Sequence, residues 1–309
     1  MPVSRRTLLA GAAAAALLPV AAVRRAGAAE PLRVVASFSI LADMVRVVGG
    51  EGVAVDALVG PDADAHVFQP SPADARRLGQ AQVVVVMGLG FEGWMSRLVR
   101  SAAYKGPVVT ASQGIQTRRM PEAKGHGHSH GHSHDVDPHL WHDPRRAQRM
   151  VRTIADALAK ADPARAAAFK ANADAYVAEI DALDRWAEAR FAAVPKDQRR
   201  IVTSHDSFGY LAERYGLTVL SPQGVSTAAE ATAQQVAQLI RQVRDRQARA
   251  IFVENVTNPR LIEQIASETG AVVGGRLYSD ALSGAGGAAP TYLALMRHNI
   301  TTIADAIVR

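Results

Sequence analysis

Seven of the ten histidines in this chain lie within the stretch GHGHSHGHSHDVDPHLWHDP, residues 125–144. Imidazole nitrogens are frequent ligands of transition metals, so the stretch predicts metal binding. Five of these histidines alternate with Gly and Ser, with no apolar neighbour to fix them: His126, His128, His130, His132 and His134. Such a segment can collect metal without defining one rigid site, so we expect an auxiliary site of low affinity here.

The last two histidines of the stretch, His139 and His142, have a different setting. They are flanked by residues that can pack and stiffen a loop, namely Pro138, Leu140, Trp141 and Pro144. A tight metal site is therefore expected around His139 and whatever other side chains converge on it.

The elements that must position these side chains follow a repeated pattern of apolar runs, each bounded by turn residues and followed by an amphipathic stretch. This alternation predicts an α/β fold with two similar lobes, each a mainly parallel four-stranded sheet flanked by helices. The expected strands cover 33–40, 53–59, 83–88 and 107–112 in the first half, and 199–205, 217–222, 250–255 and 271–278 in the second.

One long helix is expected to join the lobes. Residues 163–194 contain no Gly and place apolar side chains at alternating four- and three-residue spacing: Phe169, Ala173, Tyr176, Ile180, Leu183 and Ala187. About thirty residues would span roughly 45 Å, enough to run along both lobes. We therefore divide the chain into an amino-terminal lobe (30–162), a linking helix (163–194) and a carboxyl-terminal lobe (195–309).

Four polar residues stand at the carboxyl ends of the expected strands, where open parallel sheets bind ligands. His66 follows the second strand, and His139 lies in the long loop after the fourth, which should end at a helix start at Asp143-Pro144. His205 ends the fifth strand, and Asp280 follows the last. Three imidazoles and one carboxylate, two ligands from each lobe, suit tetrahedral zinc.

The first 29 residues predict an export signal. They have a basic start, an apolar run and small residues near the end, and Arg5-Arg6 resembles a twin-arginine signal; an ordinary secretory signal is the alternative. The chain contains no cysteine, which argues against thiolate metal sites, disulfides and a lipid anchor on an amino-terminal Cys. We therefore expect a soluble periplasmic protein without a lipid anchor.

The formal net charge of +6 comes mostly from four arginines within residues 1–29, which leave +2 for the rest of the chain. The basic balance therefore gives no reason to expect a nucleic-acid partner.

Five segments resemble, in order, the signatures of the solute-binding proteins of zinc and manganese ABC importers (cluster A-I), specifically the ZnuA-like and AztC-like zinc branch. They are GPDADAHVFQPSPAD, DPHLWHDP, SHDSFGYLAERYGL, FVENVTNPRLIEQIA and YSDALSG. The likeness runs from about Arg33 to the carboxyl end. It implies metal ligation by His66, His139, His205 and Asp280, and a rigid linking helix with little lobe rotation on binding. The manganese branch commonly has Glu at the position of His205, so this imidazole favours zinc, as does the His-rich insertion.

Other polar residues compete for these roles. His142 is close enough along the chain to reach the same ion, and Asp64 could replace Asp280 as the oxygen donor. Glu230 and Glu254 are interpreted as structural or as supports behind the ligands. His298 is expected to serve solvent or core contacts, and Trp94, Trp141 and Trp186 are expected to pack.

The sequence therefore predicts a non-enzymatic periplasmic receptor that carries Zn²⁺ as transported substrate to an inner-membrane ABC permease with its cytoplasmic ATPase. A periplasmic zinc chaperone is a further candidate partner, and the receptor is expected to be a monomer.

A manganese or iron receptor of the same fold is the first alternative. A secreted zinc hydrolase is the second, but it would need an open metal position, and no His-Glu-x-x-His helix occurs. A siderophore- or cofactor-binding protein would need an aromatic, Arg-lined cleft, whereas the cleft candidates here are His and Asp.

Overall fold

The computed structural model describes residues 30–118, 136–246, 248 and 250–308. The fold described below lies in the unit that spans residues 31–309. The predicted export signal and the histidines from His126 to His134 lie outside the described residues, so both remain predictions.

The first half builds one parallel sheet with the strand order β2-β1-β3-β4. Its strands are β1 Leu32–Phe38, β2 Val53–Val59, β3 Val83–Val86 and β4 Val108–Thr110. The central strand β1 pairs with β2 on one side and β3 on the other, with Val34 opposite both Val55 and Val83. All four residues of β3 are buried, as expected of a strand covered on both faces.

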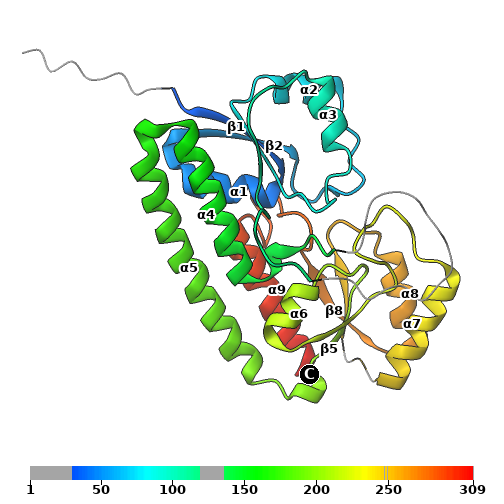
Figure 1. Ribbon diagram of the computed structural model, residues 1–309. Coiled ribbons are helices and arrows are strands. Elements are labelled where there is room, and N and C mark those ends of the chain that lie inside the picture. Colours follow the sequence, from blue (N-terminus) through cyan, green and yellow to red (C-terminus); the bar gives the residue numbers. More distant parts are fainter. Residues whose placement is uncertain (1–29, 119–135, 247, 249, 309) are drawn as a thin grey trace, which may run out of the picture. The chain divides into compact units, whose positions relative to one another are not determined.

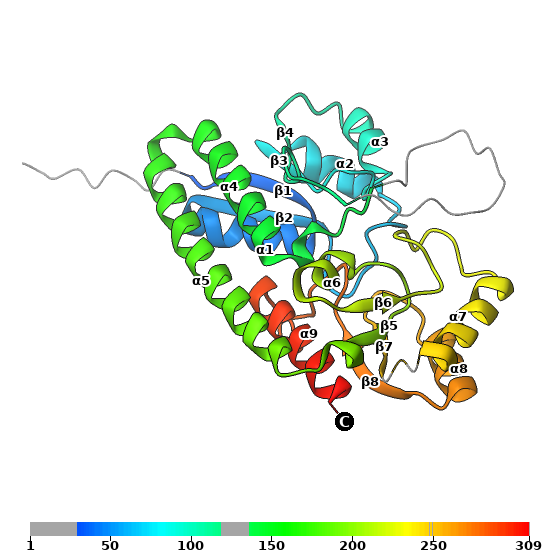
Figure 2. The same ribbon diagram turned by 60° about the horizontal axis from the view of Figure 1, so that its bottom comes forward.

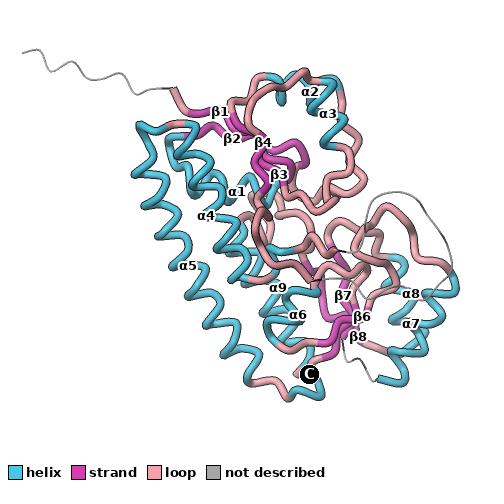
Figure 3. Tube along the Cα trace, viewed as in Figure 1, coloured by secondary structure: helices cyan, strands magenta, loops and turns pink. Residues whose placement is uncertain are grey.

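The second half repeats this order as β6-β5-β7-β8, again all parallel. Its strands are β5 Arg200–Val202, β6 Thr218–Leu220, β7 Ala250–Glu254 and β8 Val272–Leu277. The predicted fold class is therefore confirmed, and Figure 3 shows the two sets of strands with helices around them. Several predicted strands run too far. Ser39 and Ile40, predicted as strand, open helix α1, because the apolar residues continue from the strand into the helix. Strand β5 ends at Val202, so His205, predicted to end this strand, lies in the loop after it.

Helices cover the sheets. Their bounds are α1 Ser39–Gly49, α2 Pro72–Gly79, α3 Met95–Ser101, α4 Pro144–Ala161, α5 Ala166–Ala192, α6 Gly209–Tyr215, α7 Ala233–Arg246, α8 Arg260–Thr269 and α9 Tyr292–Ile307. The predicted start of α4 is confirmed, since the Asp143 side chain accepts the Arg145 backbone N–H and Pro144 takes the first helical position. This cap ends the loop that carries His139.

The long helix α5 follows the 3-10 helix Pro163–Arg165. All six apolar residues of its predicted stripe are buried, and Asp184 and Phe191 are buried with them. The helix packs on α1 and α4 from the first half and on α6 and α9 from the second, as Figures 1 and 2 show.

The main hydrophobic core is continuous across both halves. It includes Val34 and Phe38 of β1, Ile180 of α5, and Phe252 of β7. A smaller cluster lies in the second half around Val202 and Ile251. The proposed division into lobes at 162 and 195 therefore stays a prediction, because residues 31–309 pack as one compact unit.

Candidate metal centre

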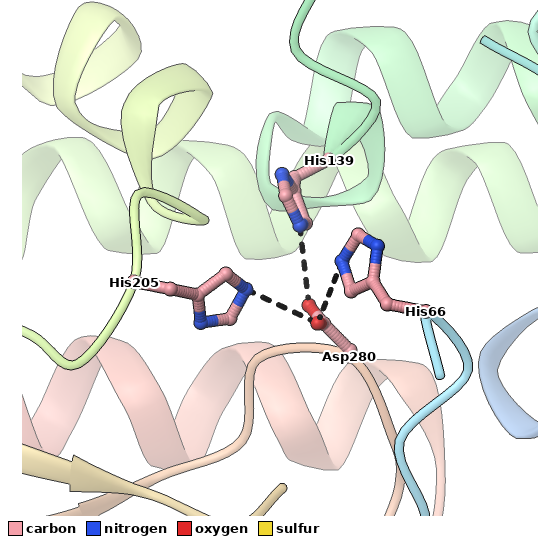
Figure 4. A group of neighbouring side chains, drawn as sticks. All are labelled: His66, His139, His205 and Asp280. Atoms are coloured by element: carbon pink, nitrogen blue, oxygen red, sulfur yellow. Dashed lines mark ion pairs between the residues drawn. The ribbon is translucent and has the colours of Figure 1, made fainter. Parts of the chain in front are cut away.

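The four residues predicted at strand ends come together at one point, where their side chains face one another (Figure 4). His66 reaches it from the loop after β2, His139 from the loop after β4, His205 from the loop after β5, and Asp280 from the loop after β8. Each offers one ligand atom, and these atoms all lie within 4.8 Å of one another.

The carboxylate of Asp280 lies at the centre of the three imidazoles. Its oxygens are 3.3 Å from Nε2 of His66, 3.4 Å from Nε2 of His139 and 3.1 Å from Nε2 of His205. The side chain of His66 is only 4% exposed, and the other three are fully buried. None of these five polar atoms has a hydrogen-bond partner within the described residues.

Buried polar atoms without hydrogen bonds are costly, and they rarely gather at one point unless they face a common partner. Three imidazole nitrogens and a carboxylate oxygen form a donor set that suits a four-coordinate divalent metal. The arrangement therefore fits a metal ion as the bound species.

A carboxylate supports His139 from behind. Nδ1 of this ring lies 2.7 Å from Oδ1 of Asp137, a fully buried residue that also accepts the His139 backbone N–H at 3.0 Å. The phenolic hydroxyl of Tyr210 donates to the backbone carbonyl of Asp137 at 2.8 Å. These contacts fix both the backbone and the ring of His139.

A second carboxylate supports His205 in the same way. Oε2 of Glu254 lies 2.6 Å from Nδ1 of His205, and Oε1 accepts the backbone N–H groups of Ser204 and His205 at 2.7 and 2.9 Å. The carboxylate of Glu254 thus joins the end of β7 to the loop after β5. This position agrees with the interpretation of Glu254 as a support behind the ligands.

The loop of His66 is held differently. Oδ1 of Asp64 accepts the His66 backbone N–H at 2.8 Å, and its Oδ2 accepts the hydroxyl of Thr227 at 2.6 Å. The indole N–H of Trp94 donates to the carbonyl of Ala65 at 2.7 Å. Asp64 is therefore engaged in positioning its own loop and does not belong to the four-residue group.

His205, Asp280 and His66 differ in how their surroundings shift their pKa values. Burial lowers the pKa of His205, but the negative charges of Glu254 and Asp280 outweigh it, so this pKa lies well above its ordinary value. Burial raises the pKa of Asp280, yet His205 and His139 hold it well below its usual range. Burial lowers the pKa of His66, and Asp280 offsets this only in part. Before metal binds, His205 and Asp280 therefore form a buried ion pair.

Several competing residues lie away from the centre. His142 is fully buried, packs against Phe208 with ring centroids 4.5 Å apart, and is not part of the four-residue group. Burial lowers its pKa to about 3. Glu230 is exposed ahead of α7. His298 lies on α9, where its Nε2 is 2.9 Å from the carbonyl of Arg276.

Two tryptophans that were expected only to pack also donate hydrogen bonds next to the site. The indole N–H of Trp141 donates to the carbonyl of Ser279, the residue before Asp280, at 2.9 Å. The Trp94 bond to Ala65 likewise meets the residue before His66. Asp137 was also missed, although its position two residues before His139 is a usable signal for a supporting carboxylate.

Comparisons with known proteins agree with this geometry. The model of a family described as "Zinc-uptake complex component A periplasmic" matches residues 34–306. The manganese-binding lipoprotein MntA of Halalkalibacterium halodurans is 31% identical over 278 residues, covering 90% of this chain and 89% of MntA. The iron-binding protein YfeA of Yersinia pestis is 32% identical over 277 residues, covering 89% and 86%.

A solved structure shares the fold. The periplasmic zinc-binding protein TroA from Treponema pallidum superposes with a TM-score of 0.83 at 30% sequence identity, covering 90% of this chain and all of TroA. The names of these relatives refer to manganese, iron and zinc. They establish the family of this chain but do not assign it to the zinc-binding branch.

The expectation of a protein without a lipid anchor is contradicted by these relatives. MntA is named a lipoprotein, and so is SloC of Streptococcus mutans, which is 27% identical over 284 residues and 90% of each chain. The expectation rested only on the absence of cysteine from the sequence. Relatives that align with about 90% of this chain are nevertheless named lipoproteins. Within the described residues, every helix is too short or too polar to cross a membrane.

A location outside the cytoplasm is supported by the periplasmic family, and so is a role in carrying a substrate rather than transforming it. Family match, fold and donor set lead to one conclusion: the chain belongs to the ZnuA family of periplasmic metal-binding receptors of ABC transporters.

Proposed function

We propose that this protein is a zinc receptor that binds Zn²⁺ through His66, His139, His205 and Asp280 and delivers it to an ABC import permease. The observation that carries the proposal is the set of buried ligand atoms within 4.8 Å of one another, none of them hydrogen-bonded within the described part of the chain. Zinc is the cargo, so the site has to bind tightly and still release the ion to its partner.

Zinc fits this donor set better than manganese does. Zn²⁺ favours four-coordinate sites built from imidazole and carboxylate, whereas Mn²⁺ favours six ligands rich in oxygen. Three of the four ligand atoms here are nitrogens, and the group is enclosed by apolar rings such as Phe91, 4.5 Å from the His66 ring between centroids. Little room remains for the additional oxygen ligands that manganese prefers.

A manganese or iron receptor of the same fold is the second candidate, and the names of MntA and YfeA are the observation that favours it. A zinc hydrolase fits less well, because catalytic zinc keeps a position open for water or substrate. With Asp280 as fourth ligand, no such position remains.

We further propose the partners that this role requires. An ABC permease accepts the ion at the membrane, and its cytoplasmic ATPase drives import. The receptor acts as a monomer, and a periplasmic zinc chaperone is a candidate donor.

Metal analysis of the purified protein tests the proposal. The protein should carry one tightly held zinc per chain, and titration of the metal-free protein against a chelator should rank Zn²⁺ above Mn²⁺ and Fe²⁺. A protein that binds Mn²⁺ or Fe²⁺ more tightly than Zn²⁺ would be assigned to the second candidate instead.

A further inference from the structure

Both oxygens of Asp137 are engaged, each by a different partner. Oδ1 faces the backbone N–H and Nδ1 of His139, and Oδ2 accepts the guanidinium of Arg118 at 2.7 Å. The Arg118 backbone N–H in turn donates to the Tyr210 hydroxyl at 3.1 Å. The plane of the carboxylate is therefore fixed from both sides.

This arrangement determines which ring nitrogen of His139 carries hydrogen. Oδ1 of Asp137 accepts the His139 backbone N–H at 3.0 Å and Oδ2 accepts the Arg118 guanidinium at 2.7 Å, so both oxygens act as acceptors. An ionised carboxylate only accepts hydrogen bonds, so Nδ1 of His139 is the donor. The lone pair is left on Nε2, the atom that faces Asp280.

The carboxylate behind His205 has no such cationic partner of its own among the described residues. Glu254 occupies the place of Asp137, but no Lys or Arg in the described part of the chain forms an ion pair with it. Arg118 also lies 3.9 Å from Oδ1 of Asp206, the residue after His205, but the carboxylate that its guanidinium hydrogen-bonds is Asp137, behind His139.

The start of helix α6 leaves room for the guanidinium. A Cβ added to Gly209 would lie 1.5 Å from Nη1 of Arg118 and 2.8 Å from Oδ2 of Asp137. The backbone of Gly209 does not have the positive φ that favours glycine. A glycine is therefore needed here only because a Cβ would collide with the Arg118 guanidinium. Residues 118, 137 and 209, far apart in the sequence, thus form one packed contact.

We propose that Arg118 is a positioning residue for metal binding: it orients Asp137, which orients His139, and Gly209 provides the space that lets the guanidinium reach Asp137. The inference rests on the proposed function, because it takes His139 to be a metal ligand. Supporting partners of this kind change metal affinity by about 10–100-fold in other proteins.

The test uses Zn²⁺ competition with a chelator on the full protein. Arg118→Met and Gly209→Ala should each weaken zinc binding by about tenfold, and the double variant should be no weaker than Arg118→Met alone, because both changes break the same contact. In the metal-free protein, long-range proton–nitrogen NMR should show His139 with hydrogen on Nδ1, and this signal should become mixed in both single variants.

Arg146→Met is the matched control. Its guanidinium lies over the same Tyr210 ring, 4.6 Å from the centroid, but it pairs with Asp143 and Glu213 and not with Asp137. Zinc affinity should be unchanged in this variant. The melting temperature of Gly209→Ala separates positioning from folding: a variant that unfolds cooperatively near the wild-type temperature and still binds zinc more weakly supports positioning.

Losses that add in the double variant, or wild-type zinc affinity in both single variants, would overturn the positioning role. Failure of the unaltered protein to bind zinc would instead refute the proposed function, so the two failures are distinguishable.

Discussion

His139 and His66 face the same point from two loops of the first half, yet they are held in different ways. The segment around His139 is bonded to the second half by buried groups: the Tyr210 hydroxyl donates to the Asp137 carbonyl, and the Trp141 indole donates to the Ser279 carbonyl. The loop of His66 meets the second half through one backbone hydrogen bond, from the Asp62 N–H to the Leu282 carbonyl at 2.9 Å. Its side-chain contacts there are partly buried or exposed, Thr227 to Asp64 and Asn255 to Asp62.

The rings differ as well. Nδ1 of His139 and Nδ1 of His205 each lie against a carboxylate, at 2.7 and 2.6 Å. His66 forms no ion pair within the described residues other than the one between its Nε2 and Asp280. A side chain that is already oriented loses less freedom on binding, so preorganisation is uneven across the site. We therefore expect His139, His205 and Asp280 to form a fixed cradle and His66 to be the most adjustable of the four proposed ligands.

The largest loss should come from the cradle. His205→Ala removes one of the four proposed ligands, and the remaining three do not complete the shell, so zinc affinity should fall on the order of 10³-fold. Competition with a chelator measures the change. His298→Ala, which removes an imidazole outside the group, is the control and should bind zinc normally.

His66→Ala should cost less, on the order of 10²-fold, because the cradle remains intact. Much of the loss should be in a faster zinc dissociation rate, which stopped-flow transfer to a chelator can follow. Equal losses for His66→Ala and His205→Ala would show that the cradle and the His66 loop are not distinct.

The pH dependence should reveal the proton on His205. Because the pKa of this imidazole is raised in the metal-free protein, zinc must displace a proton from it at neutral pH. Affinity should therefore rise by about tenfold per pH unit while pH remains below that pKa. Calorimetry in buffers of different ionisation enthalpy should detect the released proton. An affinity that is flat between pH 6 and 8 would contradict the buried ion pair.

The smallest effects should come from the two indole hydrogen bonds. Trp94→Phe and Trp141→Phe each leave a buried carbonyl without its donor, which should lower the free energy of unfolding by about 1–3 kcal/mol in urea titrations. Zinc dissociation should accelerate more in Trp94→Phe, since the His66 loop has fewer buried contacts. A larger acceleration in Trp141→Phe than in Trp94→Phe would contradict the difference proposed between the loops of His66 and His139.

Much of the fold could be predicted because parallel strands buried on both faces appear as uninterrupted apolar runs, as in Val83–Val86. The stripe of α5 was equally visible, but buried Asp184 was not. Its carboxylate accepts hydrogen bonds from Arg214 and Tyr215 in the next helix, and such pairing has no local signature.

The four candidate ligands could be predicted because each one follows a strand, and strand ends meet at one edge of a sheet. The residues that hold these candidate ligands in place could not be predicted. The contact of Arg118, Asp137 and Gly209 depends on how segments far apart in the chain pack, and no spacing encodes it. The identity of the metal also goes beyond sequence likeness, since relatives of similar identity are named for manganese, iron and zinc.

Anomalous diffraction at the zinc edge from crystals of the zinc-loaded protein tests the central claim most directly. The account predicts one fully occupied peak within about 2.0–2.2 Å of Nε2 of His66, His139 and His205 and of an oxygen of Asp280. A peak elsewhere, or an ion that keeps a water molecule in place of one of these four ligands, would contradict it.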